Sequence, residues 1–154
     1  MKLSDYLSTH RVVTDVAGGD VPAILRQLLE PLLRDGSVPE PDDMLSALLA
    51  REKILSTGIG NGIAVPHAIS ATVSRPLVIL GLSAEGVDFE SMDGEPVHVF
   101  FVLLSPPDDA GHHTQLLARI ARLGRDSEFI AALSGQRRPD AALACVEEYE
   151  RTHA

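Results

Sequence analysis

The sequence contains no tryptophan and only one cysteine, Cys145, and aromatic residues make up 4% of it. One cysteine cannot form a disulfide within the chain, which fits a reducing compartment. The longest apolar stretches are Leu77 to Leu82 and Val99 to Leu104, far below the roughly 20 residues that span a bilayer. The first residues also lack the basic and then apolar layout of a signal peptide. We therefore expect a cytoplasmic protein with no segment inserted in a membrane.

Positively charged residues are also scarce, because 13 Lys and Arg stand against 22 Asp and Glu, giving a net charge of -9. Such a chain would on the whole repel a phosphate backbone, so no nucleic-acid partner is expected. Hydrophobic residues make up 45% of the 154 positions, which is typical of globular proteins and enough for a core without disulfides or a structural metal. We expect residues 1–154 to form a single domain.

The first part of the chain predicts a strand and two helices. Residues 10–16 contain several β-branched side chains and indicate a short strand. Asp20 is placed to cap the first helix, which Pro31 would kink or end. A second helix, capped by Asp42, should carry Arg51 at its C-terminal end.

The rest of the chain predicts strands followed by three helices. Residues 77–82 and 97–104 are nearly continuous apolar runs, as in central strands covered by helices on both faces. The helices should span 108–123, 126–133 and 139–151. This order of elements implies an α/β fold, namely a three-layer α/β/α sandwich with a central mixed β-sheet.

A glycine-rich stretch from Ser56 to Gly62 is expected to be a loop that feeds a short strand and then Pro66 and His67. Its spacing fits neither the Rossmann fingerprint nor a P-loop. The glycines could supply positive φ angles in a tight surface turn, or their backbone N–H groups could close around an anion beside His67. The sequence alone leaves both interpretations open.

Two histidines are candidates for a functional role. His67 follows an expected strand, and strand ends in α/β folds are where sites gather. His113 shares a helical i, i+3, i+4, i+7 stripe with three apolar residues, so it should face inward, whereas His112 points about 100° away. The alternative for His113 is a structural role at the edge of the core. No ligand pair has zinc-motif spacing, so no metal is predicted.

The segment 51–67 resembles the signature of one known family. Its sequence is REKILSTGIGNGIAVPH, which is similar to that of type 2 IIA domains, the fructose, mannitol and nitrogen-regulatory class of the bacterial phosphotransferase system. Residues 86–89, 93–97 and 113–118 also resemble this family in order and approximate spacing. The likeness is greatest to the nitrogen-regulatory IIA protein. Thr114 departs from the family pattern, which usually has leucine there.

The resemblance implies a three-layer α/β/α phosphotransferase that relays a phosphoryl group. His67 matches the histidine that accepts this group from the histidine phosphocarrier protein. Arg51 and His113 match the residues that flank the acceptor and would stabilise the phosphate. No cofactor is expected, because a relay between protein side chains needs neither nucleotide nor Mg²⁺.

The resemblance leaves two roles open for such a relay. The first is regulation of target proteins by phosphorylation state, as in the nitrogen-regulatory branch. The second is a fructose- or mannitol-type sugar uptake system, in which the phosphate would pass to a separate IIB partner. A IIA-like binding module that no longer carries phosphate is a third interpretation, which the intact Arg51, His67 and His113 argue against.

Overall fold

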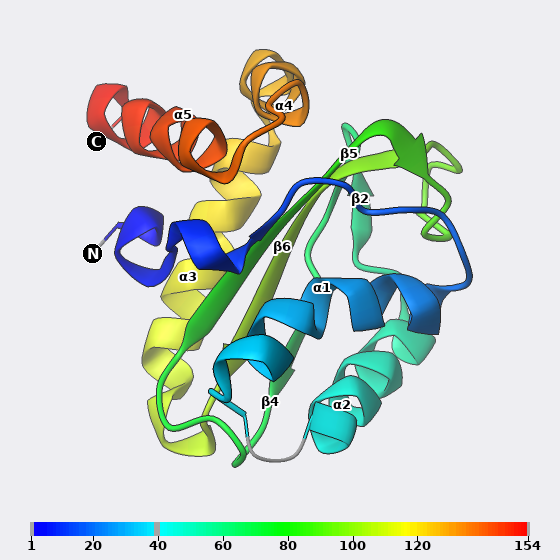
Figure 1. Cartoon of the computed structure of the whole chain (residues 1–154), viewed down its shortest axis with the longest axis vertical. Coiled ribbons are helices and arrows are strands. Elements are labelled where there is room, and N and C mark those ends of the chain that lie inside the picture. The colour runs from blue at the N-terminus through cyan, green and yellow to red at the C-terminus, as the bar shows by residue number, and fades with distance from the viewer. Residues whose placement is uncertain (1, 39–40, 154) are drawn as a thin grey trace.

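The computed structural model of the chain describes residues 2–38 and 41–153 (Figure 1). Along this described part of the chain, most of the strands follow two N-terminal α-helices and precede three C-terminal α-helices, as the sequence predicts. The helices are η1 (Leu3–Tyr6), η2 (Thr9–Arg11), α1 (Val21–Asp35), α2 (Pro41–Ile54), η3 (Pro107–Asp109), α3 (Ala110–Gly124), α4 (Ser127–Ser134) and α5 (Pro139–Thr152). The strands are β1 (Val12–Val13), β2 (Gly58–Gly60), β3 (Ile63–Ala64), β4 (His67–Ile69), β5 (Leu77–Val87) and β6 (Val97–Ser105).

These strands form one mixed sheet, which confirms the prediction. Its order is β1-β5-β6-β3-β2, and β4 also pairs with β6. The central strands β5 and β6 are antiparallel, while β1 runs parallel to β5, and β3 and β4 run parallel to β6. Ile63 pairs with Val99 and His67 pairs with Leu103, so β3 and β4 keep one register along β6. Strands β3 and β4 are separate because Pro66, just before His67, has no N–H to donate to the neighbouring strand.

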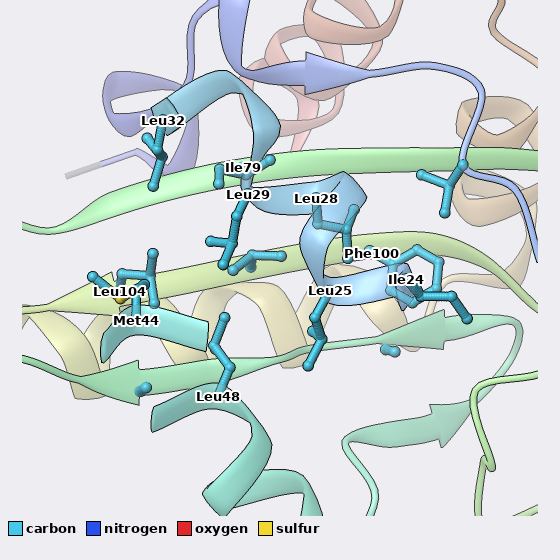
Figure 2. Close-up of a cluster of buried hydrophobic side chains, with 14 of the residues drawn as sticks. Ile24, Leu25, Leu28, Leu29, Leu32, Met44, Leu48, Ile79, Phe100 and Leu104 are labelled. Carbon is cyan, nitrogen blue, oxygen red and sulfur yellow. The ribbon is translucent and has the colours of Figure 1, made fainter. Parts of the chain in front are cut away.

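Alternate residues of β5 and β6 face opposite layers of helices. Ile79 and Phe100 belong to a core cluster with α1 and α2, part of which Figure 2 shows. Leu80 and Phe101 belong to a second cluster with α3, α4 and α5. All four side chains are fully buried, so both faces of the sheet are covered. This arrangement confirms the three-layer sandwich and explains the nearly continuous apolar runs of the two strands.

Helix α1 begins where the sequence predicts but continues past Pro31. The Asp20 carboxylate caps it by accepting a hydrogen bond of 2.9 Å from the Ala23 N–H. Pro31 lies inside the helix, which ends only before Gly36, a glycine in the left-handed conformation with φ 71°. Leu32 is only 2% exposed, and its packing offsets the backbone hydrogen bond that the proline cannot make.

Two other N-terminal boundaries differ from the predictions. The strand expected over 10–16 is reduced to the two residues of β1, because part of that stretch forms the 3-10 helix η2. Asp42 does not cap α2, since this helix already begins at Pro41. A proline fits the first turn of a helix, where a backbone N–H would have no partner within the helix.

Later boundaries agree more closely. The expected loop over 56–62 contains β2, which pairs antiparallel with β3. Helix α3 begins at Ala110 rather than at Asp108, because the chain first makes the short helix η3. Helices α4 and α5 agree with their predicted spans to within one residue at each end.

Candidate functional site

His67 is the first residue of β4 and is half-buried. Its Nδ1 atom lies 2.7 Å from the carbonyl oxygen of Val65. A carbonyl oxygen can only accept a hydrogen bond, so Nδ1 carries the ring hydrogen and donates it. In the neutral ring, Nε2 is then left with a free lone pair. The backbone therefore holds His67 as the tautomer whose nucleophilic atom is Nε2.

His113 lies near the start of α3 and is 8% exposed. Its ring centroid is 5.8 Å from that of His67, with the ring planes tilted by 54°. Its Nδ1 atom lies 2.7 Å from the hydroxyl oxygen of Ser105, at the end of β6. His112, by contrast, is exposed and hydrogen-bonds with Asp109 at 2.6 Å. The prediction that His113 faces inward and His112 outward is confirmed.

Arg51 completes the group from the last turn of α2. It lines an open pocket of about 320 Å³ together with His67 and His113, and the remaining lining residues are Ala47, Ala50, Ile54, Ala68 and Ile69. One guanidinium N–H donates to the carbonyl oxygen of Leu55 at 2.8 Å, which leaves other donors of its fork free for a ligand. Pockets of similar volume lie beside residues 5–11 and 83–85. The pocket at Arg51 is therefore distinguished by its two imidazoles and not by its volume. The structure thus brings all three predicted site residues together.

Burial is the largest effect on the protonation of both imidazoles. It lowers the pKa of His67; the hydrogen bond to Val65 raises this pKa, the charge of Arg51 lowers it, and the Glu52 carboxylate raises it. Burial also lowers the pKa of His113, and the neighbouring His67 lowers it further. An ordinary histidine has a pKa of about 6.5. Both rings are therefore neutral at pH 7, and His67 keeps its lone pair.

Glu52 and Thr57 fix the backbone that orients His67. The Glu52 carboxylate accepts hydrogen bonds from the Thr57 N–H, at 3.1 Å, and from the Thr57 hydroxyl. The Thr57 carbonyl oxygen in turn accepts from the Val65 N–H at 3.1 Å. Thr57 is buried, and Val65 supplies the oxygen that holds the His67 ring. The last turn of α2 is thus tied to the acceptor that sets the His67 tautomer.

The tip of the glycine-rich stretch lies away from His67. Gly60, Asn61 and Gly62 all have positive φ angles, of 101°, 56° and 76°. The Asn61 side chain donates to the carbonyl oxygen of Gly124 at 3.2 Å, at the C-terminal end of α3, whereas His113 lies near the other end, about 16 Å along the helix. Figure 1 likewise shows β2 and β4 at opposite ends of the sheet. The turn interpretation is therefore correct, and the anion-binding interpretation of this tip is wrong.

Ser105, Glu52 and Thr57 also belong to the site, although no sequence pattern singles them out. Ser105 is fully buried, and it closes the apolar run of β6 just before two prolines. A single hydroxyl at the end of such a run is a signal for a buried hydrogen bond. Glu52 lies inside the recognised segment, but its partner Thr57 could be found only from the fold.

Neither a metal centre nor a membrane span is evident in residues 2–38 and 41–153. Within these described residues, no group of three or more His, Cys, Asp or Glu side chains is arranged to hold a metal ion. No helix among them combines the length and apolarity that crossing a membrane requires.

Comparisons with known proteins identify the family. Residues 5–149 match the model of the family described as "Phosphoenolpyruvate-dependent sugar phosphotransferase system, EIIA 2". The nitrogen regulatory protein of Pseudomonas aeruginosa is 36% identical over 124 residues, which are 80% of this chain and 80% of that protein. The crystal structure of the nitrogen regulatory protein IIA-Ntr from Neisseria meningitidis superposes with a TM-score of 0.84 at 28% identity, covering 94% of this chain and 98% of that one.

A third relative is much longer than this chain. The fructose-specific EIIABC component of Bacillus subtilis is 29% identical over 151 residues, which are 98% of this chain but only 24% of that protein. The matched region is nevertheless nearly the whole of this chain. The chain belongs to the EIIA 2 family of the phosphotransferase system, and its fold class is that of this family.

Proposed function

We propose that this protein is a phosphocarrier that accepts a phosphoryl group on Nε2 of His67 from the histidine phosphocarrier protein. The observation that carries the proposal is the 2.7 Å contact between His67 Nδ1 and the Val65 carbonyl oxygen. It leaves Nε2 as the free nucleophile in a pocket that Arg51 and His113 also line. Membership of the EIIA 2 family, residues 5–149, supports a phosphoryl relay.

In the proposed transfer, the lone pair of His67 Nε2 attacks the phosphorus of the donor's phosphohistidine. The new Nε2–P bond forms as the donor's N–P bond breaks, and the donor nitrogen recovers its electron pair. No proton has to move, because Nδ1 of His67 keeps its hydrogen. The ring gains positive charge in this step, and the Val65 carbonyl oxygen that accepts from Nδ1 stabilises that charge.

Arg51 and His113 would stabilise the phosphoryl group itself. The transferring group spreads its charge over three oxygens, so catalysis depends on positioning and electrostatic stabilisation. The planar guanidinium of Arg51 offers several N–H donors to such oxygens. His113, 5.8 Å from His67 between ring centroids, is within reach of a group attached there. These donors supply the stabilisation that a metal ion gives in other phosphoryl transfers, so no cofactor is proposed.

The role that we favour is regulation of target proteins by phosphorylation state in the cytoplasm. It is supported by the 36% identity with a nitrogen regulatory protein over 80% of both chains. The alternative is the IIA component of a fructose- or mannitol-type uptake system that passes the phosphate to a separate IIB partner. The match of 98% of this chain with part of a fructose-specific EIIABC component supports that alternative.

The test is phosphorylation by phosphoenolpyruvate, the general phosphotransferase enzyme and the histidine phosphocarrier protein. We expect one acid-labile phosphate per chain, which His67→Ala abolishes. His10→Ala, which removes an exposed imidazole elsewhere, is the matched control and should label normally. Unchanged labelling of His67→Ala would refute the assignment.

A further inference from the structure

Ser105 presents a buried hydroxyl to the histidine that faces His67. Its side chain is completely buried at the end of β6, and its Oγ atom lies 2.7 Å from Nδ1 of His113. Its backbone carbonyl is already used, because it accepts from the Ser70 N–H at 2.8 Å. A buried hydroxyl needs a hydrogen-bond partner, and His113 is the partner that the structure gives it.

This contact leaves one ring nitrogen of His113 for the pocket. Nδ1 is engaged by Ser105, so only Nε2 can interact with a group bound at His67. A neutral imidazole carries a single hydrogen. If Nδ1 held it, Nε2 would present a lone pair. If the Ser105 hydroxyl donates to Nδ1 instead, the hydrogen is on Nε2, which becomes a donor.

The chemistry of a phosphoryl group selects between these two arrangements. Its oxygens are strong acceptors and carry negative charge at neutral pH. A lone pair on His113 Nε2 would repel them, whereas an N–H would bind them. We propose that Ser105 is a positioning residue: its hydroxyl donates to Nδ1 of His113 and holds this ring as the Nε2–H tautomer, aimed at the phosphoryl group on His67. The inference rests on the proposed function, because it takes the phosphoryl group to be on His67.

A hydroxyl suits this position for a second reason. A phosphoryl dianion beside His113 favours its cationic form, in which both ring nitrogens carry hydrogen. The Ser105 hydroxyl can rotate and accept from Nδ1 in that state, because it is both a donor and an acceptor. The contact therefore persists whether His113 is neutral or cationic. An alanine offers neither interaction, and a threonine keeps both.

The first test is the tautomer of His113 in the unphosphorylated protein, measured by nitrogen-15 NMR of the imidazole rings. We expect a hydrogen on Nε2 and none on Nδ1, and a more mixed population in Ser105→Ala. A parent protein with the hydrogen on Nδ1 overturns the inference. This measurement needs no phosphoryl transfer, so it tests the role of Ser105 even if His67 proves not to be phosphorylated.

The second test is single-turnover transfer from the phosphorylated histidine phosphocarrier protein. Ser105→Ala should slow the transfer step about tenfold, the lower end of the loss seen when a metal-bound histidine loses its hydrogen-bond partner, without changing the donor's apparent affinity. Ser105→Thr should restore the rate. Ser83→Ala removes another buried hydroxyl, one that accepts from the Gly86 N–H, and should transfer like the parent. A Ser105→Ala variant with the parent rate and the parent tautomer refutes the positioning role.

Discussion

The imidazoles of His67 and His113 lie 5.8 Å apart between ring centroids, although one belongs to the short strand β4 and the other to helix α3. Strand β6 connects them, because it pairs with β4 at His67 and ends at Ser105, which contacts His113. Strand β6 therefore contacts both rings' elements, one through strand pairing and the other through a buried hydroxyl.

Replacing either flanking donor should slow transfer without unfolding the protein. Arg51 and His113 both line the open pocket. Loss of one hydrogen-bond donor that points at the charge developing in the transition state commonly lowers the rate by a factor of about 10²–10³. Rapid-quench measurements of Arg51→Ala and His113→Ala should show this loss. The matched control is Arg34→Ala, which removes an exposed arginine of α1, and it should react at the parent rate. Parent-like rates in the two site variants, with normal circular dichroism, would refute their roles.

Phosphorylation of His67 should depend on pH through its own titration. Because only the neutral ring has a lone pair on Nε2, the rate should rise with pH, reach half of its maximum at the pKa of His67 and level off at higher pH. Burial places that pKa below the ordinary value of histidine, so the midpoint of the rise lies below about pH 6.5. NMR titration of the His67 ring should give the same midpoint.

Two substitutions should move that midpoint in opposite directions. Arg51 lowers the pKa of His67 and Glu52 raises it. Arg51→Gln should therefore shift the titration of His67 to higher pH, whereas Glu52→Gln should shift it to lower pH. Shifts of the same sign in both variants would contradict this electrostatic account.

Adjacent leucines of α1 should differ sharply in their effect on stability. Leu32 is 2% exposed and packs in the cluster of Figure 2, whereas Leu33 is 50% exposed. Leu32→Ala should lower the free energy of unfolding by about 2–5 kcal/mol because it leaves a cavity, and Leu33→Ala by less than about 0.5 kcal/mol. Urea denaturation of both variants measures the difference. Equal effects would mean that α1 does not continue in register past Pro31.

Much of this architecture could be predicted because the apolar patterns leave few alternatives. The runs that became β5 and β6 could be covered only by helices on both faces, and the stripe of His113 fixed which way its side chain points. The tip of the glycine-rich stretch could not be assigned, since its distance from His67 depends on how β3 and α3 pack. Ser105 was missed for a related reason: its partner is eight residues away and is reached only when α3 folds back on β6.

The turn at Asn61 and Gly62 should contribute to stability but not to phosphoryl transfer. Gly62 has φ 76°, and a Cβ there would meet the His98 ring at 3.3 Å. Gly62→Ala should therefore destabilise the fold by about 1–2 kcal/mol. Gly18→Ala, where a Cβ meets nothing within 4 Å, is the control. Both variants should be phosphorylated on His67 like the parent at a temperature where they are folded. A loss of phosphorylation in Gly62→Ala alone would indicate that the turn is part of the site.

A regulator and a transport component should differ in how their partners respond to phosphorylation. The pocket at His67 is bordered by the apolar side chains of Ile54 and Ile69, which are 80% and 44% exposed, so a partner that docks there would contact any group on His67. A phosphoryl group adds about -1.5 to -2 charges beside the cation of Arg51. If the protein is a regulator, a target protein should therefore bind one phosphorylation state more tightly than the other. Capture of partners with phosphorylated protein and with His67→Ala side by side measures this preference.

Uptake of fructose and mannitol by cells that lack the protein is the complementary measurement. Collapse of one uptake activity, with no partner that discriminates between the two forms, would favour the transport role.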